Sequence, residues 1–294
     1  MKKNKGGASN FKSAITFIAP AFIFYFIFVV LPWISAIFFS FFSWDGIGSA
    51  VWNSYRNYLN VFKDPEQLRS IKNSISLIFF FSLIPVFLGL VSASVISDMK
   101  SKSQIARLSR LIIFIPQVLP LIAVGIAWKL IFSPNGLINQ SLNLIGLTKF
   151  QHGWLGDFNF AIKAIGIVGV WLGTGLCSLL FSAGIQKIDS HLYESIQIDG
   201  GGKIIEFFNV TLPSLRPEIR FAITITMISA LSGFDLVYVM TNGGPGGRTL
   251  VPGLEVFRLA FTYQQFGQAC ALAVILSLIT FSFILLVAKL LKDY

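Results

Sequence analysis

The sequence is short of charge. Lysine, arginine, aspartate and glutamate make up only 12% of its 294 residues, whereas soluble domains average about 25%. So little charge excludes an ordinary water-soluble domain, and we expect an integral membrane protein. A net charge of +10 would indicate nucleic-acid binding in a soluble protein. Here the basic residues flank apolar runs, so no nucleic-acid partner is predicted.

Cysteine and histidine are also scarce, with two residues of each. Cys177 and Cys270 fall inside predicted membrane spans, so no disulfide is expected, and the two cysteines do not indicate a redox compartment. His152 and His191 fall on opposite sides of the predicted topology and cannot share a metal ion. The sequence has no metal-ligand spacing, nucleophile motif or carboxylate pair. It therefore predicts no metal site, no catalytic residues and no enzymatic activity.

Apolar residues dominate what is present: 54% of the chain is hydrophobic, and 30 residues are phenylalanine. A membrane-spanning helix needs about 20 apolar residues. Six stretches are long enough, at roughly 14–41, 73–96, 110–132, 163–185, 219–240 and 268–290. The first follows a basic segment without the cleavage site of a signal peptide, so we expect it to be retained. The predicted fold class is an all-α integral membrane protein with six transmembrane helices.

Lysine and arginine orient these spans, because they concentrate in segments that face the cytoplasm. They favour both termini inside, with a cytoplasmic tail over residues 1–13 and a membrane domain over 14–294. The long loop over residues 186–218 then also lies inside. The first outer loop carries aromatic residues that either anchor at the membrane interface or contact an external binding protein: Trp44, Trp52, Tyr55 and Tyr58.

The cytoplasmic loop has a helical pattern of its own, which we call the elbow (residues 188–217). Asp189 or Ser190 can cap the start of a first helix. That helix is predicted to end at Asp199, because the glycine run 200–202 supplies left-handed backbone.

A second short helix is predicted after the glycines. Ile204, Phe208 and Leu212 are spaced four apart and therefore share one face. Pro213 is predicted to stop this helix at Leu212, since a residue before proline avoids helical geometry. Two short helices joined by glycine suit insertion into a groove on a partner.

This elbow resembles the EAA loop of permease subunits in binding-protein-dependent ABC importers. The matching residues are Glu194, Ile198, Asp199, Gly200, Phe207, Thr211, Leu212, Pro213, Arg216 and Pro217. The departures are Ser195, Ile196 and Gly201 at alanine positions, Ile204 for tryptophan and Val210 for isoleucine. The resemblance implies coupling to an ATPase through Glu194, Ile198, Asp199, Gly200, Phe207, Leu212 and Pro213.

Shorter matches resemble the carbohydrate branch of these permeases, typified by the maltose and glycerol-phosphate importers. They are Trp128-Lys129 with Phe132, Pro134 and 136–139, then Trp154-Leu155-Gly156, and Phe234-Asp235 with Thr241, 243–245 and Thr249. The resemblance implies a type I importer permease fold in the cytoplasmic membrane of a bacterium or archaeon. It implies as partners a second homologous permease, a cytoplasmic ATPase dimer that holds ATP and Mg, an extracytoplasmic solute-binding protein, a sugar and membrane lipid. This chain itself is expected to bind no cofactor.

A substrate path is predicted where the fifth span turns polar. Asp235 is costly in lipid and is expected to face protein or water. Hydroxyl, carboxylate and ring groups that suit a sugar are offered by Ser232, Phe234, Asp235 and Tyr238, with Thr174 on span four. Structural capping or packing between subunits is the alternative. Gly169 and Gly173 form a small-residue pair that indicates close helix packing.

The predicted function is ATP-driven inward transport of a sugar or oligosaccharide by alternating access. One alternative is a permease for another solute, such as a glycerol phosphodiester. Another is an ion-coupled secondary transporter, which should show paired broken helices or an inverted repeat and several buried charges. A scaffold or sensor would not need the elbow. The glycine run before Lys203 is not a phosphate loop, because Gln197 and Ile204 occupy the required glycine and hydroxyl positions.

Overall fold

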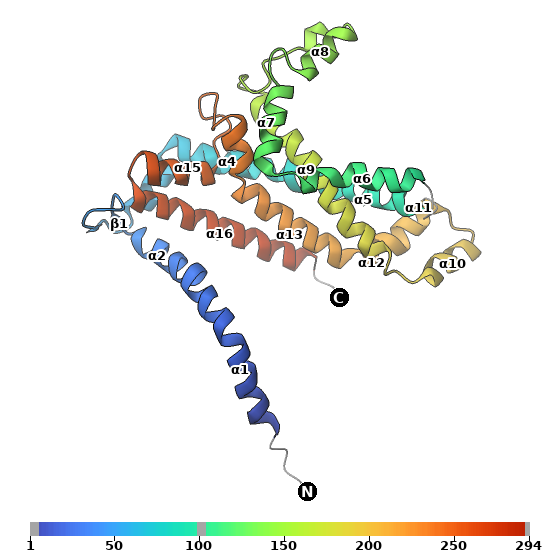
Figure 1. Ribbon diagram of the computed structural model, residues 1–294, viewed down its shortest axis with the longest axis horizontal. Helices are drawn as coiled ribbons and strands as arrows, with labels where there is room; N and C mark the ends of the chain where they lie inside the picture. Colours follow the sequence, from blue (N-terminus) through green and yellow to red (C-terminus); the bar gives the residue numbers. More distant parts are fainter. Residues whose placement is uncertain (1–5, 99–103, 292–294) are drawn as a thin grey trace. The chain divides into compact units, whose positions relative to one another are not determined.

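The computed structural model describes residues 6–98 and 104–291 and is built almost entirely of helices (Figure 1). The predicted all-α membrane fold is thereby confirmed. Residues 1–5 of the predicted cytoplasmic tail lie outside the described residues. The chain divides into two compact units, Met1–Lys63 with Val256–Val274, and Asp64–Glu255 with Ile275–Tyr294.

The first unit joins a long apolar helix to a small polar head. A two-residue antiparallel ladder in the head pairs Phe42 with Trp52. Its elements are α1 (Gly6–Tyr25), the π-helical turn η1 (Phe26–Val30), α2 (Leu31–Phe39), β1 (Phe42–Ser43), β2 (Val51–Trp52), α3 (Arg56–Lys63), η5 (Arg258–Thr262) and the start of α16 (Phe266–Leu290).

The second unit is a helical bundle that also takes the rest of α16. Its elements are α4 (Pro65–Ile78), η2 (Phe79–Leu83), α5 (Ile84–Asp98), α6 (Gln104–Val118), α7 (Leu121–Ile131), α8 (Leu137–Leu144), η3 (Thr148–Phe150), α9 (Ala161–Ile185), α10 (Ser190–Ile198), α11 (Lys203–Glu206), η4 (Phe207–Thr211), α12 (Leu212–Ser214), α13 (Arg216–Ser232), α14 (Asp235–Met240) and α15 (Pro252–Phe257), which crosses the unit boundary.

Within the described ranges, four helices are long and apolar enough to cross a membrane, and each overlaps a predicted span: Thr16–Phe39, Pro65–Ser97, Ala161–Ile185 and Phe266–Leu290. The other two predicted spans are not continuous helices. The span predicted over 110–132 breaks at 119–120, where the chain bends by 104° between its two halves. Pro120 has extended backbone there, because a proline lacks the amide that would continue the helix. The span predicted over 219–240 is divided between α13 and α14 at Gly233.

The second unit is organised around α9, which packs along α5 and α6 (Figure 1). The close approach predicted for two glycines of α9 is observed. A methyl group on Gly169 would overlap the ring of Phe81, and one on Gly173 would lie 2.8 Å from Pro85.

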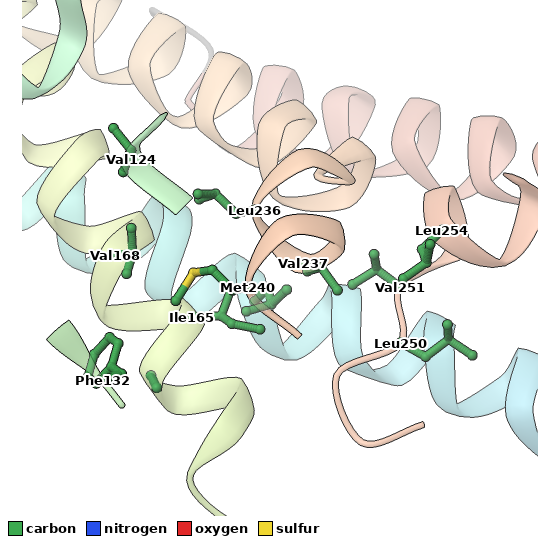
Figure 2. Packing of buried hydrophobic residues seen from close by; sticks show 12 residues of the cluster. Val124, Phe132, Ile165, Val168, Leu236, Val237, Met240, Leu250, Val251 and Leu254 are labelled. Atoms are coloured by element: carbon green, nitrogen blue, oxygen red, sulfur yellow. The ribbon is translucent and has the colours of Figure 1, made fainter. Parts of the chain in front are cut away.

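The short helix α14 has a core of its own between α7 and α9. Figure 2 shows the side chains that fill it, among them Val124 of α7 and Ile165 of α9. The remaining members come from α4, the end of α7, α9, α14 and the segment after α14 that leads into α15: Leu77, Phe132, Ala164, Val168, Leu236, Val237, Met240, Leu250, Val251 and Leu254. This packing holds the second half of the broken fifth span in place.

Candidate functional site

The elbow begins with α10, whose two ends are closed as the sequence predicts. Asp189 caps its start, since its Oδ1 accepts the backbone N–H of His191 at 3.0 Å. At its end Gly201 N–H donates to the Ile196 carbonyl at 2.8 Å, and Gly200 N–H donates to the Gln197 carbonyl at 3.1 Å. This is the Schellman arrangement, which requires left-handed backbone at the first residue past the cap. Gly200 supplies it with φ of +78°.

The second arm is helical from Lys203 to Ser214, through α11, η4 and α12. The predicted stop at Leu212 is therefore wrong, because Leu212 keeps helical backbone and α12 continues past Pro213. The π-helical turn η4 ends at Thr211, two residues before the proline. A wider turn relieves the clash between the proline ring and the preceding carbonyls that ends an ordinary helix.

The residues predicted to couple fall on two faces of the elbow. Phe207 and Leu212 pack inward against the buried cluster of Leu90, Phe181 and Leu215. Ile198 faces outward and is 85% exposed. Glu194 is exposed, and its Oε2 lies 3.3 Å from Nδ1 of His191. Asp199 and Gly200 are exposed at the bend, and Pro213 is half-buried.

The outward face of the elbow carries further apolar side chains besides Ile198. Ile204 is 75% exposed and Phe208 is 59% exposed. The predicted shared face of the second helix is thus divided, since Leu212 turns inward. Three large apolar side chains exposed on one bend are typical of a surface that another protein covers.

Sequence reasoning missed Glu206, which lies inside the elbow and is 4% exposed. Its Oε1 accepts a hydrogen bond from Nε2 of Gln197 at 2.8 Å, and its Oε2 accepts one from Nζ of Lys203 at 3.0 Å. These two hydrogen bonds hold the pKa of Glu206 below its ordinary value. Gln197 belongs to α10 and Glu206 to α11, so the carboxylate ties the two arms together. The sequence gives one indication that Glu206 is buried: it precedes Val210 by four residues, so the two share an apolar helix face.

A second tie joins the arms nearby. The hydroxyls of Tyr193 on α10 and Thr211 on η4 lie 3.0 Å apart. Both residues line a cavity of about 230 Å³, together with Glu206, Gln197 and the carboxyl-terminal end of α5. The elbow is therefore one rigid piece and not two loosely hinged helices.

The second feature is a cavity of about 420 Å³ at the two helix breaks. Leu119 and Leu121 line it at one break, and Gly233 lines it at the other. Non-helical backbone at membrane depth is tolerated where it lines a water-filled cavity. The polar side chains that line it are Gln117, Thr226, Ser229, Ser232 and Asp235.

The structure brings together only part of the predicted substrate path. Ser232 and Asp235 line the cavity, and Asp235 is exposed in the first turn of α14. Phe234 and Tyr238 instead stack on each other, with ring centroids 5.1 Å apart, and do not belong to the lining. The Thr174 hydroxyl donates to the Val170 carbonyl at 2.7 Å, and Thr174 does not line the cavity either.

Three polar lining residues were not predicted. The side-chain amide of Gln117 donates to the Leu172 carbonyl, which joins α6 to α9. Thr226 meets the hydroxyl of Ser82 at 2.7 Å, and Ser229 donates to the Ile225 carbonyl. The sequence does single out Gln117, because a polar amide between two prolines is unusual in an apolar run. Over residues 6–98 and 104–291, no group of three His, Cys, Asp or Glu is placed to hold a metal ion.

Comparison with known proteins gives a family match over residues 85–293, to the family described as binding-protein-dependent transport system inner membrane component. The probable ABC transporter permease protein YurN of Bacillus subtilis is 31% identical over 278 residues, which cover 94% of each chain. The diacetylchitobiose uptake system permease protein NgcF of Streptomyces coelicolor is 34% identical and covers 93% of this chain and 80% of its own.

A solved structure shares the fold. The crystal structure of a bacterial alginate ABC transporter, in complex with an alginate pentasaccharide-bound periplasmic protein, superposes with a TM-score of 0.84. The match covers 99% of this chain and 98% of that chain, at 20% sequence identity.

Proposed function

Because the chain belongs to the family of inner membrane components of binding-protein-dependent transport systems, we propose that it is the permease subunit of an ATP-driven ABC importer. It moves a sugar or oligosaccharide inward by alternating access across the cytoplasmic membrane of a bacterium or archaeon. The name of the Streptomyces relative, a diacetylchitobiose uptake permease, supports the sugar class. The polar cavity at the helix breaks supports a path for a hydroxyl-rich solute.

The observation that carries the proposal is the rigid elbow with its exposed apolar face. A cytoplasmic ATPase dimer, which holds ATP and Mg, covers Ile198, Ile204 and Phe208, while this chain binds no cofactor and catalyses no reaction. Leu215 alone separates α12 from α13. A displacement of the elbow therefore reaches α13 directly, and α13 ends at the cavity beside Gly233. A second homologous permease completes the pore, and an extracytoplasmic solute-binding protein delivers the sugar.

Gly200→Leu tests the elbow. A left-handed backbone costs a residue with a side chain roughly 1–2 kcal/mol, so the bend must open or twist. We expect membrane insertion to be unchanged and ATP-dependent uptake into vesicles to be abolished. Gly202→Ala is the matched control, because Gly202 has φ of −88° and open space around it. Full uptake by the Gly200→Leu transporter would reject coupling through the elbow.

Asp235→Leu tests the cavity. It removes the carboxylate from the cavity wall without touching the elbow, so ATPase docking is expected to be intact. The rate of uptake or the preference across a panel of sugars is expected to change at least tenfold, because a buried hydroxyl then loses its acceptor. Unchanged uptake across the panel would assign Asp235 a structural role.

One observation favours an ion-coupled transporter as the second candidate, since the breaks of two predicted spans line one cavity. The two mechanisms differ in their energy source. Vesicles that contain ATP but have no ion gradient accumulate sugar if the chain serves an ABC importer. Accumulation with an ion gradient in the absence of ATP would favour the second candidate.

A further inference from the structure

The head of the first unit holds a polar cleft of about 640 Å³, which shares no lining residue with the cavity at the helix breaks. This volume lies within the 300–1,000 Å³ typical of small-molecule sites. Carboxamides dominate its lining: Asn53, Asn57, Asn60, Gln264, Gln265 and Gln268. Of the described residues that line it, Asp45 is the charged one, and none is a lysine or arginine.

The walls of the cleft are built by buried contacts. Asn57 is 5% exposed, and its Nδ2 donates to the carbonyls of Ser40 and Phe42, each at 2.8 Å. The Gly267 N–H donates to the Trp44 carbonyl at 3.1 Å. A methyl group on Gly267 would collide with the Phe42 carbonyl, so only glycine allows this approach. These contacts join the loop after α2 to α3 and to the start of α16, and they shape the walls of the cleft.

Other amides of the lining are left available. No side-chain hydrogen bond joins Asn60, Gln264 or Gln268 to another group within residues 6–98 and 104–291. Asn60 and Gln264 are exposed, and Gln268 is half-buried. Each carboxamide offers two donors and two acceptor lone pairs. This is the pattern that hydroxyl groups need, because a hydroxyl both donates and accepts.

We propose that this cleft is a binding site for a neutral oligosaccharide, separate from the cavity at the helix breaks. It lies after the first span and before the last, so with both termini in the cytoplasm it opens on the outer side of the membrane. Sugar delivered from outside would meet it before entering the pore. This inference rests on the proposed function for its orientation and for the sugar class.

Asp45 limits the charge of the ligand. Its Oδ1 accepts the backbone N–H groups of Ile47 at 2.9 Å and Gly48 at 2.8 Å. Both hydrogen bonds lower the pKa of Asp45, and the bond from Ile47 has the larger effect. The carboxylate is therefore ionised at neutral pH. A fixed negative charge in a lining without a cation repels uronic acids. The cleft therefore selects neutral sugars over acidic ones.

Saturation-transfer NMR on the full chain in nanodiscs tests the site. The probes are maltose, lactose, trehalose and diacetylchitobiose, with an alginate oligosaccharide as the acidic probe. An Asp235→Leu background weakens any signal from the membrane cavity. We expect at least one neutral probe to bind and the acidic probe not to bind. Asn60→Ala combined with Gln264→Ala should weaken binding at least tenfold. Gln140→Ala, an exposed amide of α8 outside the cleft, should leave binding unchanged.

Three results would overturn the site. The first is the absence of a saturation-transfer signal for every neutral probe. The second is a signal that the double variant Asn60→Ala and Gln264→Ala does not change. The third is a double variant that impairs uptake but still binds sugar. The last would make the cleft a docking surface for a protein. Binding in nanodiscs without ATP-dependent uptake would instead reject the proposed function and leave the site standing.

Discussion

At the scale of the residue, Glu206 is the charged side chain that helps to join the two arms of the elbow. It is a buried carboxylate that accepts one hydrogen bond from Gln197 of the first arm and another from Lys203 of the second arm. Charge-assisted hydrogen bonds of this kind are about twice as strong as neutral ones. Both bonds stabilise the ionised form and thereby lower the pKa of Glu206. The shape that a partner meets on the outer face therefore depends on a charge hidden inside.

The lowered pKa predicts an acid-sensitive elbow. A group whose folded-state pKa is depressed stabilises the fold above its unfolded pKa, about 4.3 for glutamate, and loses that contribution as the pH falls through the lowered folded value. Amide hydrogen exchange over residues 190–214, corrected for intrinsic rates, should show protection at pH 6 that declines below about pH 4.3. Glu206→Gln should show the low protection at both pH values.

Glu194→Gln is the control for this measurement, because Glu194 is an exposed acid of the same elbow. It should keep the wild-type protection at pH 6. Equal protection of Glu206→Gln and wild type at pH 6 would contradict the role given to Glu206.

At the scale of the element, α9 is the helix against which the second unit is built. Its glycines let η2 and α5 approach closely, with Phe81 over Gly169 and Pro85 over Gly173. Two neighbouring spans are broken, and their broken ends form the cavity. A continuous, tightly packed α9 can hold such breaks in position, whereas a loosely packed helix could not.

Gly169→Val should destabilise the permease by roughly 1–3 kcal/mol, the usual range for overpacking. The added side chain has no space beside the Phe81 ring, so α9 and η2 must separate. The thermal unfolding midpoint in detergent, followed by intrinsic tryptophan fluorescence, should fall.

Ala183→Val is the control, because Ala183 is an exposed residue of the same helix. Its midpoint should stay near that of the wild type. Equal midpoints for the two variants would show that α9 tolerates added bulk at Gly169 and would contradict the packing argument.

At the scale of the whole molecule, the family assignment makes the chain a multi-pass inner-membrane protein. The proposed coupling to an ATPase requires the elbow to face the cytoplasm. The proposed sugar site requires the amide-lined cleft to face outward. These two requirements are independent features of one topology, and a single labelling experiment tests both.

A membrane-impermeant thiol reagent should label Ser195→Cys on the elbow only from the cytoplasmic side. It should label Ser49→Cys in the outer cleft only from outside, because the two positions lie in segments predicted on opposite sides. The native thiols give little background, since Cys177 is 0% exposed and Cys270 is 7% exposed. Labelling of Ser195→Cys from outside would remove the basis of ATPase coupling.

The sequence by itself determined the features that depend on neighbouring residues. Low charge and long apolar runs identify a membrane protein, and the glycines of the elbow predict its left-handed bend at Gly200. The family followed from the spacing of residues in that elbow. These signals are local, because turn chemistry, helical periodicity and span length are set within a few residues along the chain.

Only the tertiary structure decided what depends on distant segments. It divided the third and fifth spans and placed Ser232 and Asp235 beside Gln117, which the sequence had not linked to them. It buried Glu206, turned Leu212 inward and left Ile198, Ile204 and Phe208 exposed. The reason is physical: a periodic pattern shows which residues share a face, but the helix that packs against that face decides which of them meet solvent.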